Sequence, residues 1–161
     1  MRRRFTDDRG FTLFELVIAM VVLSILLAMA ALNGPVFLAH NRLASAARQV
    51  ATDLRLVRAK AVTQTSSFRV VFANGAASYT VERSDGAGGW TAHALHAKAL
   101  AAEDPVIVAL PEPVRLASAQ TIVFEPRGNV TAPAAVPLRV PALPGVARTV
   151  DVSFTGEVRI R

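Results

Sequence analysis

Residues 9–15 read Arg-Gly-Phe-Thr-Leu-Phe-Glu, and this stretch places one acidic residue at the start of a long apolar run. From Leu16 to Asn41 the chain contains no Asp, Glu, Lys or Arg. A helix rises 1.5 Å per residue, so a helix from Phe11 to Leu32 is roughly 33 Å long and matches the ~30 Å hydrocarbon core of a bilayer. The pattern therefore predicts a membrane-spanning helix with Glu15 at its edge.

The carboxylate of Glu15 is costly in that position. A charged side chain at the centre of a spanning helix costs roughly 2 to 3 kcal/mol or more, and such groups in membranes are usually paired. We therefore expect Glu15 to find a cationic partner.

The residues around this carboxylate resemble the amino-terminal signal of type IV pilins and of the pseudopilins of type II secretion. That signal reads Gly, then Phe or Met, then Thr-Leu-x-Glu before an apolar helix, and the matching residues here are Gly10, Phe11, Thr12, Leu13 and Glu15. The resemblance implies that a prepilin peptidase cuts between Gly10 and Phe11, and that the new amine of Phe11 is methylated. It also implies that Glu15 pairs with the terminal amine of a neighbouring subunit and fixes axial register as a filament grows.

Two other interpretations of the apolar run are a cleaved secretory signal peptide and a plain signal anchor. Ala28-Met29-Ala30 does look like a signal peptidase site. However, the run exceeds the usual apolar length of ~7–15 residues in signal peptides, and Glu15 interrupts it. In every case the basic residues at the start favour a cytoplasmic amino terminus and a periplasmic remainder in a two-membrane bacterium: Arg2, Arg3, Arg4 and Arg9.

Composition allows one modest folded domain beyond the membrane helix. The chain has 161 residues and a formal net charge of +6, and removal of the leader 1–10 leaves a weakly basic chain. The absence of cysteine excludes disulfides, thiol catalysis and Cys-ligated zinc. The domain must therefore be held together by packing alone.

The chain divides into a leader at 1–10, a transmembrane or filament-core helix at 11–33, an amphipathic continuation at 36–64 and a periplasmic β-rich domain at 66–161. Asn33-Gly34-Pro35 should kink or briefly break the helix. The continuation carries a narrow apolar stripe at spacings of three and four, formed by Leu43, Ala47, Val50, Leu54, Val57 and Ala61. Asp53 and five basic residues fall outside this stripe, and the basic residues are expected on a solvated face, with anionic headgroups near Arg42: Arg42, Arg48, Arg55, Arg58 and Lys60.

After Thr65 the hydrophobic period changes to two, which predicts antiparallel strands. A hairpin is expected around Asn74-Gly75, with strands near residues 68–72 and 79–82, and further strands near 90–92, 106–110 and 121–125. A terminal hairpin is expected from strands at 148–154 and 157–161. Between them Pro133, Pro137, Pro141 and Pro144 predict a loop or a blunted sheet edge. The fold class is thus α+β, with the long helix packed on a carboxy-terminal antiparallel β domain.

The second half resembles the GspH and FimT group of minor pseudopilins. Residues 124–128, Phe-Glu-Pro-Arg-Gly, look like that group's Phe-x-Pro-x-Gly turn, and Val150 to Ile160 look like its closing strand pair. The resemblance implies a minor pseudopilin in the periplasmic pseudopilus of a type II secretion system. Its partners would be other pseudopilins or pilins, prepilin peptidase and an inner-membrane assembly platform. The alternative it leaves open is a minor pilin of a type IV pilus, FimT-like or FimU-like, in pilus priming or DNA uptake.

No motif indicates an enzyme, a metal or a cofactor. His93 and His96 lie three residues apart, but the surrounding Ala-rich segment lacks a defined scaffold, so we expect a surface role. For DNA, the candidate contacts are Arg148, Arg159 and Arg161. Glu157 stands where DNA-binding relatives carry the first Arg of a Gly-Arg-x-Arg motif, so we do not expect nucleic-acid binding.

Overall fold

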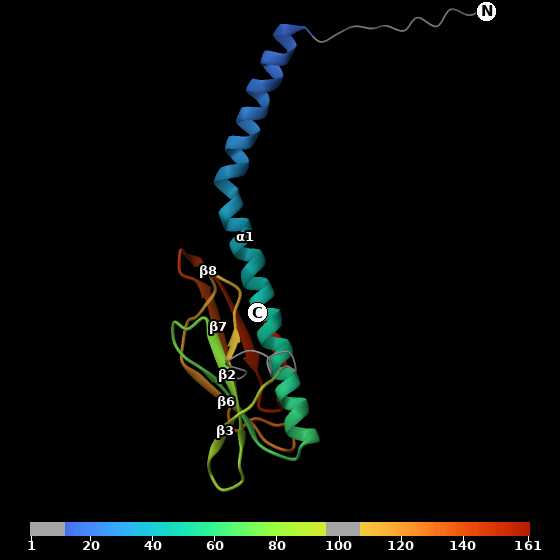
Figure 1. Ribbon diagram of the computed structural model, residues 1–161, viewed down its shortest axis with the longest axis vertical. Helices are drawn as coiled ribbons and strands as arrows, with labels where there is room; N and C mark the ends of the chain where they lie inside the picture. Colours follow the sequence, from blue (N-terminus) through green and yellow to red (C-terminus); the bar gives the residue numbers. More distant parts are fainter. Residues whose placement is uncertain (1–11, 96–106) are drawn as a thin grey trace, which may run out of the picture. The chain divides into compact units, whose positions relative to one another are not determined.

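The computed structural model describes residues 12–95 and 107–161, and it contains one long helix followed by antiparallel strands (Figure 1). The helix α1 runs over Leu13–Thr63 and is 51 residues long. The predicted α+β class is confirmed. The chain divides into two compact units, of which the first ends at Phe37 and the second begins at Leu38.

The first unit is the amino-terminal part of α1, whose apolar side chains are exposed along the helix. No single straight helix among the described residues meets the length and composition of a membrane span, whereas Leu13–Met29 and Gly34–Thr63 meet them together as a bent pair. Pro35 lies inside α1, so it does not end the helix, and the predicted interruption is at most a bend. The boundaries 11–33 and 36–64 stay predictions.

The second half of α1 buries one stripe against the β domain. The six predicted stripe residues, from Leu43 to Ala61, are all buried, and Ala39, Ala46 and Ala51 join them. Asp53 is buried as well, at 3% exposure, so its predicted place outside the buried stripe is wrong. The spacing explains this, because Asp53 is three residues after Val50 and four before Val57, on the face that those residues share.

The strands form two antiparallel sheets. The first sheet has the order β3-β2-β1-β6, with β4 also paired to β2, and the second has the order β5-β7-β8-β9. The first sheet comprises β1 (Phe68–Phe72), β2 (Ser78–Ser84), β3 (Trp90–Ala92), β4 (Ile107–Ala109) and β6 (Gln120–Phe124). The second comprises β5 (Arg115–Leu116), β7 (Ala134–Val140), β8 (Leu143–Val152) and β9 (Val158–Ile160). The predicted hairpins β1–β2 and β8–β9 are both present.

Alternation along the strands sends one face of each sheet into a common core with α1. In β1 the side chains of Phe68, Val70 and Phe72 are buried, while Arg69 and Val71 between them are half-buried. Residues opposite them on β2 and β6, such as Val81 and Ile122, are buried too. The period-two pattern thus becomes the inner face of the sheet.

The prediction of a loop or a blunted sheet edge for the proline-rich stretch is only partly correct: Pro133 and Pro141 lie outside the strands, whereas Pro137 and Pro144 lie within β7 and β8. Pro137 lies within β7, a strand with neighbours on both sides, and β8 extends back to Leu143. The carbonyl of Pro137 accepts from Ala117 N, and a strand residue directs its N and O to the same side. That side is where the short strand β5 ends, so the missing N–H of proline costs no ladder bond with a neighbouring strand.

Candidate functional site

The amino-terminal end of α1 carries the predicted assembly residue. Thr12 caps the helix, because the N–H of Glu15 donates to Thr12 Oγ1 at 3.2 Å and the N–H of Leu16 donates to the Thr12 carbonyl. Thr-x-x-Glu is the capping-box pattern, so the motif also defines the helix start. The side chain of Glu15 is exposed among exposed apolar neighbours, including Leu13 and Phe14. Gly10 and Phe11 lie outside the described residues.

Polar contacts on one flank of α1 join it to the first sheet. Gln49 Nε2 donates to the carbonyl of Ala109 at 2.8 Å, and the hydroxyl of Tyr79 donates to Asp53 Oδ2 at 2.5 Å. Both contacts link residues far apart in the chain. They fix the height of β2 and β4 along the helix axis.

The Tyr79–Asp53 contact is buried, with Tyr79 at 2% exposure. Burial, the hydrogen bond to Asp53 and the charge of Asp53 together raise the pKa of the Tyr79 hydroxyl far above its usual value of 10.0. Tyr79 therefore stays a donor throughout the physiological range.

Lys60 joins the last turn of α1 to the segment that follows β3. Its Nζ donates to the carbonyls of Ala94 and Leu95, at 3.3 and 3.1 Å, and lies 3.3 Å from His93 Nε2. Desolvation, then the charges of Lys60 and Arg83, lower the pKa of His93. His93 packs edge-on against Phe68, so it is a structural side chain at the helix–sheet junction. His96 lies outside the described residues, within which no group of three metal-ligating side chains occurs.

The other flank of α1 contacts the second sheet and the turn after β6. An Nη atom of Arg55 donates to the carbonyl of Val158 at 3.0 Å, and Nε of Arg58 donates to the carbonyl of Gly128 at 2.8 Å. Arg55 is exposed, as predicted for a solvated face, whereas Arg58 and Lys60 are half-buried, which corrects the prediction for these two; all three side chains donate to backbone carbonyls. The sequence carries no local signal for these contacts, because each acceptor lies 34 to 103 residues away.

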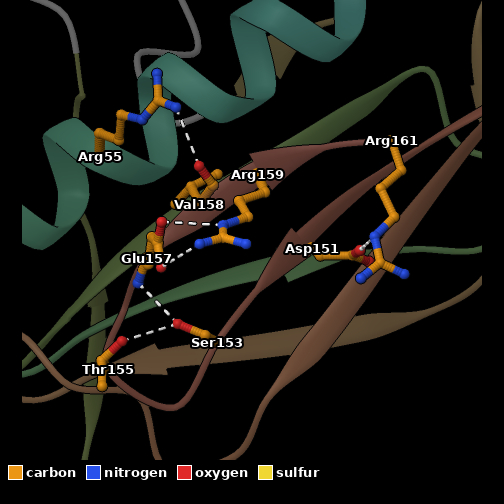
Figure 2. A network of polar contacts seen from close by, with 8 residues as sticks. All are labelled: Arg55, Asp151, Ser153, Thr155, Glu157, Val158, Arg159 and Arg161. Carbon is orange, nitrogen blue, oxygen red and sulfur yellow. Dashed lines mark hydrogen bonds and ion pairs between the residues drawn. The ribbon is translucent and has the colours of Figure 1, made fainter.

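The carboxy-terminal arginines lie beside acidic partners (Figure 2). Arg159 makes a bidentate contact with Glu157, in which Nε donates to Oε1 at 3.0 Å and Nη2 donates to Oε2 at 3.3 Å. Arg161 Nε lies 3.0 Å from Asp151 Oδ2. These residues line an open hollow of about 520 Å³ whose floor includes Ala134 and Ala135.

Arg148 is exposed and directly precedes Thr149, which exchanges two backbone hydrogen bonds with Arg161, but neighbouring residues of a strand face opposite sides, so Arg148 lies on the sheet face opposite to that of Arg161. It stands opposite Leu138 in the β7–β8 ladder, whereas Arg159 stands opposite Asp151 in the β8–β9 ladder. The structure therefore brings together two of the three proposed DNA contacts, both next to carboxylates. DNA contact by these residues stays a prediction.

Comparison with protein families gives two matches that together span most of the chain. The prokaryotic N-terminal methylation motif matches residues 6–31, and the type II transport protein GspH matches residues 46–156. A comparison with curated protein sequences gave no significant match.

Solved structures show the same fold. The minor pseudopilin EpsH from the type 2 secretion system of Vibrio cholerae is 17% identical, with a TM-score of 0.58 over 74% of this chain and 96% of that one. A second EpsH structure gives 14% identity and a TM-score of 0.59 over 75% and 96%. The type IV minor pilin FimU of Pseudomonas aeruginosa is 13% identical, with a TM-score of 0.53 over 74% and 92%.

Proposed function

The chain belongs to the GspH family of type II transport proteins, and from this premise we propose that it works as a minor pseudopilin, a structural subunit of a periplasmic pseudopilus that contributes to protein export. The observation that carries the proposal is the combination of a methylation motif at residues 6–31 with the GspH domain at 46–156 in one chain. The subunit acts by assembly and carries out no chemistry of its own.

In this proposal prepilin peptidase removes residues 1–10, and Phe11 becomes the methylated amino terminus. The apolar part of α1 anchors the subunit in the inner membrane, with its amino terminus cytoplasmic and the β domain periplasmic. The subunit then leaves the membrane through an assembly platform. Glu15 neutralises the amine of a neighbouring subunit, which offsets the cost of a carboxylate in an apolar setting.

The contacts on both flanks of α1 support this mechanism. An assembly that grows by stacking helices must also position each β domain, and here five helix side chains hold that domain: Gln49, Asp53, Arg55, Arg58 and Lys60. These side chains contact both sheets, so they hold the β domain in a single orientation around the second half of α1 and at a single position along its axis. Helix register therefore defines the position of the domain surface.

A minor pilin role in a type IV pilus is the second candidate, and the fold shared with FimU favours it. The two machines use the same amino-terminal signal, so the distinction needs a phenotype. Deletion of the gene and complementation with the full chain provide one.

For a pseudopilin, deletion should retain exoproteins in the periplasm, and the wild-type gene should restore their export while Glu15→Ala should not. Arg148→Ala serves as the matched control, because its exposed side chain takes part in none of the helix contacts above. Normal export combined with lost surface pili in the deletion strain would instead assign the chain to a pilus. Normal export and normal pili would contradict both roles.

A further inference from the structure

The outward side of α1 in the β-domain unit carries a regular stripe that no other described element covers. Its residues recur at alternating spacings of four and three, and all are exposed: Ser45, Arg48, Thr52, Arg55, Ala59 and Val62. We call this set the outer stripe. In Figure 1 the strands lie along one side of this part of α1. A 3.5-residue period is the spacing with which one helix packs along another.

The charge of this side of the helix has a single sign. Between Leu38 and Thr63 the only acidic residue is Asp53, and it is buried against Tyr79 on the opposite side. Among the described residues no carboxylate forms an ion pair with Arg48 or Arg55. The outer stripe is therefore a basic surface without internal neutralisation.

The two arginines of the outer stripe are spaced for a helical partner. Arg48 and Arg55 are one heptad apart, which is roughly 10 Å along the helix axis. Arg55 is also held in place by its bond to the Val158 carbonyl, and a guanidinium has five N–H donors, so most of its donors remain available. A guanidinium that is already ordered loses less entropy when it binds a carboxylate.

An apolar groove follows the arginines toward the end of α1. It has a volume of about 370 Å³ and is lined by Arg55, Arg58, Ala59, Val62 and Thr63. Val62 is 48% exposed, so its side chain is accessible to a partner. The groove offers a place for an apolar side chain beside the charged contacts.

We propose that the outer stripe binds an acidic helix of a neighbouring pilin-like subunit, with carboxylates one heptad apart on Arg48 and Arg55 and an apolar side chain in the groove at Ala59 and Val62. This inference rests on the proposed function and specifies the partner chemistry of one surface. A protein helix fits better than anionic headgroups, because the stripe runs along the helix axis and ends in an apolar groove that a charged headgroup would not fill.

Thiol cross-linking in cells tests the proposal. The chain contains no cysteine, so Ala59→Cys creates the only thiol in the full-length protein. A heterobifunctional reagent couples to this thiol at one end and, on illumination, inserts into any neighbouring side chain at the other, so the partner needs no thiol. We expect an adduct with a pilin-like subunit, and mass spectrometry should place the linked partner residue next to an acidic helix segment. Ala147→Cys, exposed on β8, is the matched control and should give at least fivefold less adduct.

Charge reversal then tests the mechanism. Arg48→Glu should lower the adduct yield at least fivefold, and reversal of the facing carboxylate in the partner should restore it. Thr52→Glu changes an exposed residue between the two arginines, so it should also lower the adduct yield at least fivefold while both arginines remain. Normal leader removal and membrane retention show that each variant inserts, and wild-type protease resistance of the β domain shows that it folds.

Three results overturn the inference. Equal adduct yields from Ala59→Cys and Ala147→Cys would show that the outer stripe has no preferred partner, and yields unchanged by both charge variants would exclude an acidic partner. A third is an absence of protein adducts, which would exclude a protein partner; weaker binding of Arg48→Glu to phosphatidylglycerol vesicles would then assign the stripe to headgroups. Each of these leaves the pseudopilin role intact, whereas failure of the wild-type chain to enter a filament would contradict that role itself.

Discussion

Arg58 Nε donates to the carbonyl oxygen of Gly128, and the same oxygen lies 2.2 Å from the point that a Cβ on Gly156 would occupy. Helix α1, the turn after β6 and the turn between β8 and β9 therefore meet at one oxygen atom. Both glycines have positive φ, at 82° and 75°. The Phe-Glu-Pro-Arg-Gly turn at 124–128 and the glycine of the closing strand pair thus take part in one three-way contact.

Gly156→Ala should destabilise the domain strongly, by about 2–4 kcal/mol in the free energy of unfolding. The alanine meets the Gly128 oxygen and Arg58 in addition to the cost of positive φ. Gly75→Ala is the matched control, because Gly75 has a φ of 74° with open space around it and should lose only about 1 kcal/mol. Urea unfolding of the full chain in detergent measures both, and equal losses would show that the three-way contact has no energetic role.

Tyr79→Phe should cost about 1–3 kcal/mol, because it leaves the buried carboxylate of Asp53 without its hydroxyl donor. The variant should also differ in its response to pH. Folding raises the pKa of Tyr79, so this stabilisation is complete below the unfolded value of 10.0 and declines as the pH rises above it. The stability of Tyr79→Phe should lack this alkaline decline.

The single tyrosine of the chain makes this directly measurable. Tyrosinate absorbance reports Tyr79 alone, and its titration in the folded protein should start well above pH 10 and fall to about 10 on unfolding. An ordinary titration in the folded state would contradict a buried Tyr79–Asp53 contact. Asp53→Asn should lower the folded pKa, since it removes the negative charge beside the hydroxyl.

The sequence predicts those parts of the fold that follow from local period. The apolar stripe from Leu43 to Ala61 and the hairpin at Asn74-Gly75 both appear where spacing and turn chemistry place them. The pilin-like class was also predictable, because the motif at residues 10–15 defines both the start of the helix and its apolar character.

What the sequence did not predict depends on contacts between distant segments. Pro137 is acceptable inside β7 only because β5 ends beside it, and the length of β5 has no local signal. Likewise the acceptors of Arg55 and Arg58 are backbone carbonyls, which every residue supplies. Asp53 is the exception, since its spacing from Val50 and Val57 already placed it on the buried face.

Gly10→Ala should slow leader removal. The peptidase is expected to cut after Gly10, and a methyl group there obstructs close approach of the backbone to the enzyme. The unprocessed chain keeps ten residues, so pulse-chase labelling should show a persistent heavier band. Ala28→Leu is the control, since it disrupts the competing Ala-x-Ala site and should leave processing unchanged. If only Ala28→Leu changed processing, the chain would be cut as an ordinary signal peptide.

Glu15→Ala should separate membrane insertion from assembly. Removal of a charge from an apolar helix lowers the cost of insertion by roughly 2–3 kcal/mol at most, so membrane retention should be normal or better. Incorporation into filaments should fall at least tenfold, because the amine of the neighbouring subunit then enters an apolar setting without a counter-charge.

Thr12→Ala offers a structural comparison. It removes the cap on the Glu15 N–H, costs about 1 kcal/mol of helix stability and leaves the carboxylate in place, so it should reduce incorporation far less. Immunoblots of sheared filament fractions measure the incorporation of the wild-type, Glu15→Ala and Thr12→Ala chains. Incorporation of Glu15→Ala at the wild-type level would mean that the carboxylate has no part in docking.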